Sequence, residues 1–267
     1  MHARISVVVI ALGTSLATAQ PAKKGGEKGD LAAAAAALNG ADSERAAKAA
    51  TALGAATAPA AHEALLDGLA LGLPPAVAVP ALGALAAHPA PPDVGALKRY
   101  AGHHNPVVRA AAVVALAMYP DPSGRAMIVA RLHDPQAVVR SGAAVAAARG
   151  RIRDAVEPLL LLLAKGEEPA ARALAQLADP VLAARIADQL GKVPEPMLAL
   201  CLGGILVRND FGPDPARVEV VRAISKLQDV SAIKALTEYL DATAKLPPRP
   251  SRAEAQMIVE ARLGGGK

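Results

Sequence analysis

A short segment that returns after 31 residues is the feature of this sequence that most limits its fold. Val107-Val108-Arg109 opens one apolar segment, and Val138-Val139-Arg140 opens another 31 residues later. Each step contains two apolar segments of helical length, separated by Pro, Gly or Asp. A fixed step of this size with two helices inside it is typical of a helical solenoid. We therefore predict an all-α superhelix built from about six or seven helix pairs.

The composition supports stacked helices rather than one large core. Apolar residues make up 53% of the chain, yet aromatic residues make up only 1%. Most of the apolar residues are Ala, which enters a helix at little cost and lets neighbouring helices approach closely. Runs of β-branched residues long enough for strands are nearly absent after the first ten residues. An all-helical chain follows.

The first residues have the order of a secretory signal peptide. Arg4 precedes an apolar run from Ile5 to Ala17, and Ala17-Thr18-Ala19 has the small residues of a cleavage site. The run is shorter than the ~20 residues that span a bilayer, so we expect no stable membrane span. We predict that residues 1–19 are a signal peptide cleaved near Ala19, and that the protein is periplasmic or extracellular.

The remainder divides into three parts by composition. Residues 20–30 are rich in Gly and Lys and predict a flexible leader. Residues 31–245 contain the repeated apolar segments and predict the solenoid. Residues 246–267 begin with the Pro-rich link LPPRP and continue into a last helix, Arg252 to Leu263, which we expect to cap the stack.

The segment from Asp134 to Gly150, DPQAVVRSGAAVAAARG, resembles repeats of the HEAT and armadillo class. It is most similar to the short HEAT-like repeats of phycobilisome lyases, and the resemblance covers most of the chain. It implies a HEAT-like solenoid. Such repeats favour an Asp six residues before the Arg, and of Arg109, Arg140 and Arg172 only Arg140 has one.

These three arginines are candidates for setting the register between repeats. Each lies in the first turn of a predicted helix, where the helix dipole disfavours a cation. We expect Arg109, Arg140 and Arg172 to pair with an Asp, such as Asp134, or with a carbonyl of an adjacent turn. The alternative is a row of arginines presented to a ligand. We favour the register role, because a one-dimensional stack depends on it.

A basic block in the middle of the chain is the candidate binding surface. Nine basic residues and three acidic residues lie between Lys98 and Asp154. Arg99 and Arg131, 32 residues apart, fall opposite the apolar stripes of two successive second helices. With Lys98 and Arg125 they would form the basic part of a groove along the inner curve, holding an acidic protein. The alternative is that these are solvated charges.

Several classes of site find no support in the sequence. His103, His104 and His133 are the only grouped histidines, and no cluster of Cys or carboxylates completes a metal set. We predict no metal, no cofactor and no catalytic residue, because no nucleophile–base order or phosphate loop occurs. Nucleic acid is not expected, because no aromatic residues interleave the basic ones. The lone Cys201 lies in an apolar setting and is expected to be inert.

Two further patterns concern packing. The run from Leu159 to Leu163 contains no polar residue and predicts the best-buried helix segment. Gly203-Gly204 lies inside an apolar segment and predicts a close contact between helices.

We interpret the protein as an exported, non-catalytic, protein-binding scaffold, because a solenoid offers a long curved surface to a partner. The resemblance leaves an enzyme or enzyme subunit of the bilin-lyase type as the first alternative. A structural envelope protein that self-associates is the other. A shared fold does not establish chemistry, and nothing in the sequence sets the oligomeric state.

Overall fold

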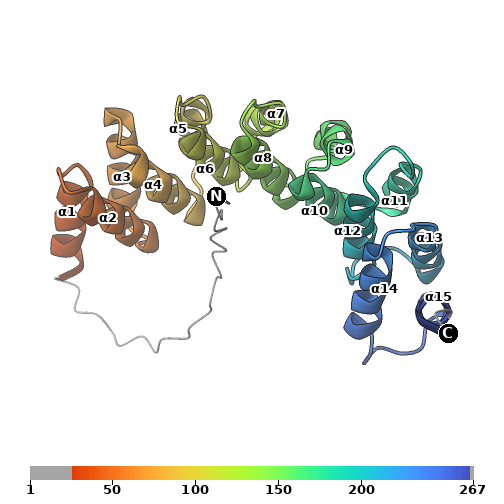
Figure 1. The fold of residues 1–267 in the computed structure, drawn as a ribbon. Coiled ribbons are helices and arrows are strands. Elements are labelled where there is room, and N and C mark those ends of the chain that lie inside the picture. The colour runs from red at the N-terminus through yellow and green to blue at the C-terminus, as the bar shows by residue number, and fades with distance from the viewer. Residues whose placement is uncertain (1–25, 265–267) are drawn as a thin grey trace, which may run out of the picture.

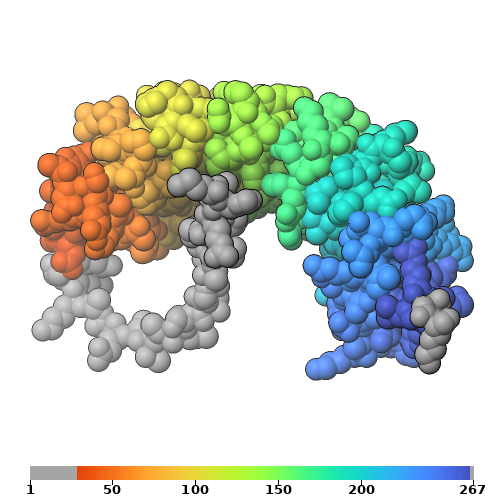
Figure 2. Space-filling view, viewed as in Figure 1, coloured from red at the N-terminus to blue at the C-terminus, as the bar shows by residue number. Residues whose placement is uncertain are grey.

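The computed structural model describes residues 26–264. Within this range the chain forms fifteen α-helices and one 3₁₀ helix, η1 (Arg153–Ala155), and no strand. The helices stack side by side into an open arch (Figure 1), whose outline is also visible in the space-filling view (Figure 2). The predicted all-α superhelix is confirmed. The predicted signal peptide, residues 1–19, lies outside the described residues.

The arch has two layers of helices, which alternate along the chain. The inner layer consists of α2 (Ser43–Ala55), α4 (Pro75–Ala87), α6 (Pro106–Leu116), α8 (Ala137–Arg149), α10 (Glu168–Leu177), α12 (Glu195–Leu206) and α14 (Ser231–Ala242). The outer layer consists of α3 (Pro59–Leu71), α5 (Asp93–Ala101), α7 (Pro122–Arg131), α9 (Val156–Ala164), α11 (Pro180–Ala187), α13 (Asp214–Ser225) and α15 (Pro250–Gly264). The remaining helix, α1 (Gly26–Leu38), packs on α2 and α3 at the N-terminal end.

Local sequence signals explain where the helices begin. The side chain of Asp42 accepts hydrogen bonds from the first backbone N–H groups of α2, and Asn105 does the same for α6. Proline occupies the first turn of many of the others, where its missing N–H costs nothing. α1 begins at Gly26, earlier than the start predicted at Leu31. The predicted leader, residues 20–30, therefore overlaps this helix at its C-terminal end.

The space between the two layers is filled by Ala, Val and Leu side chains. On α9, Leu159 and Leu163 are fully buried and Leu162 is nearly so, whereas Leu161 is 60% exposed. One face of this helix packs against the inner layer, and at ~100° per residue the run of five leucines must also cover part of the outer face. The predicted burial of this segment is therefore right for three of its leucines and wrong for Leu161.

Helices of the inner layer approach each other across glycine and alanine. A Cβ atom on Gly203 would lie 2.9 Å from the Cβ of Ala235 on α14. A Cβ atom on Gly204 would lie 2.9 Å from the Cβ of Ala175 on α10. The close contact predicted for this glycine pair is confirmed, and it joins α12 to both of its neighbours. None of the described helices combines the length and apolar character needed to cross a bilayer.

Candidate interaction surface

Large apolar side chains are exposed along the inner layer. Val107 of α6 and Met118, just beyond the end of α6, are 53% and 42% exposed, and Val138 and Val145 of α8 are 45% and 44% exposed. Because α6 and α8 pack against each other and carry the 31-residue repeat, these side chains form two adjacent stripes. A contiguous exposed apolar surface is typical of an interaction site.

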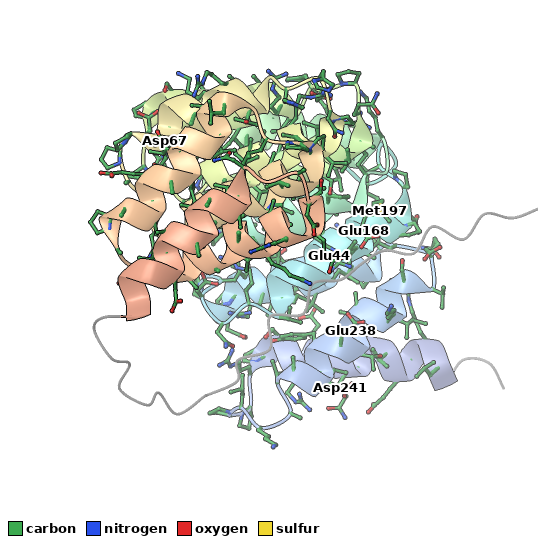
Figure 3. All side chains as sticks on the ribbon, turned by 90° about the vertical axis from the view of Figure 1, so that its left-hand side faces the viewer. Glu44, Asp67, Glu168, Met197, Glu238 and Asp241 are labelled. Atoms are coloured by element: carbon green, nitrogen blue, oxygen red, sulfur yellow. The ribbon has the colours of Figure 1, made fainter. Side chains whose placement is uncertain are left out.

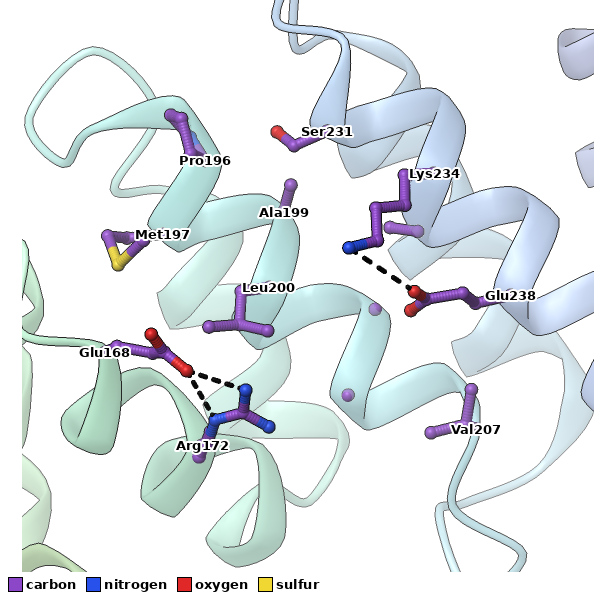
Figure 4. Close-up of a pocket in the computed structure, with 13 residues that line it drawn as sticks. Glu168, Arg172, Pro196, Met197, Ala199, Leu200, Val207, Ser231, Lys234 and Glu238 are labelled. Atoms are coloured by element: carbon purple, nitrogen blue, oxygen red, sulfur yellow. Dashed lines mark hydrogen bonds and ion pairs between the residues drawn. The ribbon is translucent and has the colours of Figure 1, made fainter. Parts of the chain in front are cut away.

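The surface continues across α10, α12 and α14. A hollow of about 350 Å³ lies between α8 and α10, and another of about 480 Å³ lies over α10, α12 and α14 (Figure 4). In Figure 3, Glu168, Met197 and Glu238 mark three of these inner helices, whereas Asp67 belongs to the outer helix α3. We call this surface the inner groove; it comprises Val107, Val114, Met118, Val138, Val145, Glu168, Arg172, Met197, Leu200, Val207, Lys234 and Glu238.

Charges in these two hollows are mostly paired within the protein. Arg172 and Glu168, which line both hollows, form an ion pair with 2.6 Å between Nη2 and Oε1. On the far side of the larger hollow, Lys234 Nζ lies 3.9 Å from Glu238 Oε1 (Figure 4). Between these two pairs the hollow is lined largely by apolar side chains, among them Leu200. The arrangement suits an apolar side chain flanked by polar groups.

The predicted register role of Arg172 is wrong. Its side chain is exposed and pairs with Glu168 of its own helix instead of reaching an adjacent repeat. The 31-residue step that relates Arg109 to Arg140 leads next to Ala171, which is fully buried. A shift of one residue turns a side chain by ~100° around the helix, so Arg172 faces the inner groove.

Arg109 makes the contacts that the register interpretation requires. Its Nη1 donates hydrogen bonds to the carbonyl oxygens of His103 and His104, each at 2.9 Å. Its Nε and Nη2 donate to the two carboxylate oxygens of Asp134, at 3.1 and 2.9 Å. The guanidinium therefore joins the end of α5 to the turn that precedes α8, and the carboxylate offsets the unfavourable helix dipole.

Arg140 repeats this arrangement one step later. Its Nη1 donates to the carbonyl oxygens of Asp134 and Pro135, each at 3.0 Å. Its Nε donates to Glu167 at 2.9 Å, so a glutamate replaces the aspartate of the preceding repeat. The ladder of Arg–carboxylate pairs thus holds for two repeats even though the predicted Asp spacing does not continue.

Asp134 is buried and ionised because arginines surround it. Burial acts to raise the pKa of this carboxyl, but the hydrogen bonds from Arg109 and from the backbone N–H of Gln136 outweigh it. The charges of Arg109 and Arg131 act in the same direction, so the pKa lies below its ordinary value. Arg131 Nη1 lies 3.6 Å from Asp134, which makes Arg131 a third member of this cluster.

The four residues predicted to form a basic groove do not line the inner curve. They lie on α5 and α7, in the outer layer, because the helices that begin with Val-Val-Arg are the ones facing inward. Arg99 is exposed there, Arg131 contacts Asp134, and Lys98 donates a hydrogen bond to Ser123 at 3.0 Å. The predicted placement on the inner curve is therefore wrong.

Arg125, the fourth residue of the predicted basic groove, lines a hollow together with Arg149, which the sequence analysis did not single out. Arg125 in the first turn of α7 and Arg149 in the last turn of α8 line a hollow of about 230 Å³. We call this hollow the basic pocket. Met118 of the inner groove also lines it, and Arg149 lines the neighbouring hollow between α8 and α10. The basic pocket therefore adjoins the inner groove.

A buried carboxylate, Asp93, was also missed from the sequence. Its Oδ1 lies 2.6 Å from Nε2 of His62, and its Oδ2 accepts hydrogen bonds from Tyr119 Oη at 2.6 Å and the N–H of Ala90 at 2.9 Å. Burial, with the hydrogen bond to Asp93 and its charge, raises the pKa of Tyr119. The fully buried Asp93 joins α3, α5 and the end of α6, so we assign it a structural role.

The predicted histidine group and the cysteine show no site chemistry. His103 stacks on Tyr100, and burial and the neighbouring His104 lower its pKa. Within residues 26–264 no three His, Cys, Asp or Glu side chains are close enough to hold a metal ion. Cys201 is fully buried, and burial raises the pKa of its thiol, which disfavours the reactive thiolate.

Comparison with known proteins identifies the repeat type. Residues 62–149 and 95–178 match the family model of HEAT repeats. A search of curated proteins by sequence found no match. A solved structure of Kap121p bound to Ste12p is similar with a TM-score of 0.58 at 14% identity, covering 88% of this chain and 33% of that one. Kap121p bound to the extreme C-terminus of the phosphatase Cdc14p gives 0.57 at 14% identity, covering 90% and 34%.

A third solved structure is similar over its whole length. It is the complex of CpcE and CpcF of phycocyanin lyase from Nostoc, with a TM-score of 0.48 at 18% identity, covering 97% of this chain and 99% of that one. The chain spans about a third of the length of Kap121p. At 14% identity the two Kap121p structures show the fold alone.

Proposed function

Since residues 62–178 match the HEAT-repeat model and the described helices form a solenoid, we propose that the chain is a scaffold that binds a protein partner in its inner groove. The observation that carries the proposal is the exposure of large apolar side chains on the inner helices or just beyond their ends, namely Val107, Met118, Val138, Val145 and Val207. Burying apolar surface is the main driving force of most protein association. A segment of a partner that covers these side chains would gain that free energy.

The depth of the groove supports a role in binding polypeptide. Glycine and alanine residues line part of the larger hollow. Because they are small, Leu200 and Val207 remain accessible to a side chain of a partner. The karyopherin Kap121p, which is similar in fold over about a third of its chain, was solved bound to the extreme C-terminus of the phosphatase Cdc14p. Paired charges and apolar walls suit docking rather than acid–base chemistry, which is why we propose a non-catalytic role.

A matched pair of variants tests this proposal. Val145→Lys places a charge in the inner groove, whereas Val181→Lys places the same charge on the outer helix α11, where Val181 is 73% exposed. In affinity capture followed by mass spectrometry, the wild type and Val181→Lys should retain one dominant partner that Val145→Lys loses. Equal capture by both variants would place the interaction elsewhere.

We also propose that the protein works outside the cytoplasm. The support is the order of residues 1–19, a basic start followed by an apolar run and small residues. N-terminal sequencing of the protein made in its own cells should find Gln20 as the first residue. A soluble cytoplasmic product that keeps Met1 would contradict export.

A further inference from the structure

The basic pocket differs from the rest of the inner groove because its charges are unpaired. Within residues 26–264, neither Arg125 nor Arg149 forms an ion pair or a hydrogen bond with another side chain, and both are exposed. No acidic residue lines the pocket. By contrast, Arg172 in the neighbouring hollow is already neutralised by Glu168. The basic pocket is thus the place in the groove region where positive charge remains available to a ligand.

The position of the basic pocket relates it to the apolar stripes. Met118 lies just beyond α6 and continues its exposed stripe, and Arg149 follows Val145 at the end of the stripe of α8. Because residues 31 apart are equivalent, Met118 and Arg149 occupy corresponding places on adjacent helices. A bound segment that covers the stripes therefore reaches the two arginines at one of its ends.

This juxtaposition selects one kind of ligand. A lipid surface or a nucleic acid presents an extended array of negative charge, whereas the groove beyond this pocket offers mainly ion pairs and apolar side chains. A polypeptide with apolar side chains and a carboxylate satisfies both parts of the surface. Two guanidinium groups beside a sheltered hollow are well suited to a carboxylate, which accepts paired hydrogen bonds from arginine.

We infer that the basic pocket receives an aspartate or glutamate side chain of the bound partner, next to apolar side chains that cover Met118 and Val145. This inference rests on the proposed binding of a protein partner in the inner groove, and it adds which chemistry that partner carries. It also predicts that binding weakens as salt is raised, because a charge contact is screened.

A displayed library of random short peptides, selected on the full chain, tests the inference. The enriched peptides should carry Asp or Glu beside aliphatic residues. They should bind the double variant Arg125→Glu/Arg149→Glu about tenfold or more weakly than the wild type. The matched control is Arg99→Glu/Lys226→Glu, which makes the same change in net charge on exposed residues of the outer layer and should bind like the wild type.

The outcomes separate the inference from the function on which it rests. Peptides that lose binding to Val145→Lys but bind Arg125→Glu/Arg149→Glu like the wild type would overturn the inference alone. Enriched peptides without an excess of acids would do the same. Peptides that bind Val145→Lys unchanged would overturn the proposed function too. Replacing the acids of an enriched peptide by Lys should restore binding to the double variant, which shows that this variant is folded.

Discussion

Arg109 Nη2 lies 2.9 Å from Asp134 Oδ1, which ties the first turn of α6 to the turn that precedes α8. The same guanidinium also satisfies carbonyl oxygens at the end of α5. One side chain thereby joins three segments of the chain. Neighbouring repeats of a solenoid otherwise contact each other through apolar faces, which resist sliding less than a directional ion pair does.

Asp134→Asn should therefore destabilise the fold. The change leaves the guanidinium of Arg109, whose side chain is 12% exposed, without its carboxylate. We expect a loss of about 2–4 kcal/mol in the free energy of unfolding, measured by urea denaturation. The control is Asp154→Asn, which makes the same charge change at an exposed side chain and should have little effect.

The same pair predicts how stability depends on acid. Because the pKa of Asp134 is lowered in the folded protein, its contribution is present above its ordinary pKa of about 3.9. The contribution is lost as the pH falls through the lowered value. The difference in unfolding free energy between wild type and Asp134→Asn should thus shrink below pH ~4. A difference that stays constant down to pH ~2 would mean that this carboxylate contributes no charge interaction.

The leucines of α9 should differ strongly in how much their substitution by Ala lowers the free energy of unfolding. Leu159→Ala empties a fully buried site and should cost about 2–5 kcal/mol. Leu161→Ala removes a side chain that is 60% exposed and should cost less than about 1 kcal/mol. Chemical denaturation of the two variants side by side measures both values. Similar losses would show that the face of α9 is assigned wrongly.

Two glycines of the inner layer should respond to alanine in opposite directions. A Cβ on Gly54 would collide with Ala84 on α4, so Gly54→Ala should cost about 1–3 kcal/mol. Nothing lies within 4 Å of a Cβ on Gly83, so Gly83→Ala should stabilise α4 by about 0.5–1 kcal/mol. Thermal unfolding of the two variants should shift in opposite senses. A stabilising Gly54→Ala would contradict the close approach of α2 and α4.

Arg99→Glu should affect neither stability nor partner capture. The side chain is exposed on the outer helix α5, and exposed substitutions stay within about ±0.5 kcal/mol. The measurement is capture of the partner by the variant beside Val145→Lys. Loss of the partner with Arg99→Glu alone would show that the outer layer binds it after all.

Much of the fold could be predicted because its signals are local. Proline in a first turn and a capping Asp42 or Asn105 mark helix starts within the sequence itself. The two-helix step then fixes the stacking. The layer to which a helix belongs could not be predicted in the same way, because both helices of a step carry an apolar stripe. Only the positions of glycine and alanine between inner helices distinguish them.

The binding surface was harder to predict for the same reason. Arg99 and Arg131 occupy matching places in the sequence, but they lie on the outer layer, and Arg131 is drawn to Asp134. Arg172 was misassigned by a single residue of register, which changed its face. Arg149 is distinguished by having no ion-pair partner among the described residues. Ion pairing depends on three-dimensional contacts, which the sequence does not show.

The contrast between the two layers has a mechanical consequence. At Gly54, Gly203 and Gly204 the inner helices touch alanines of their neighbours and cannot move closer. A hollow of about 350 Å³ lies between the outer helices α11 and α13. Bending of the arch would therefore change the spacing of the outer helices more than that of the inner helices. The spacing along the proposed inner groove would be preserved, so a partner of fixed length would stay in register while the width of the arch changed.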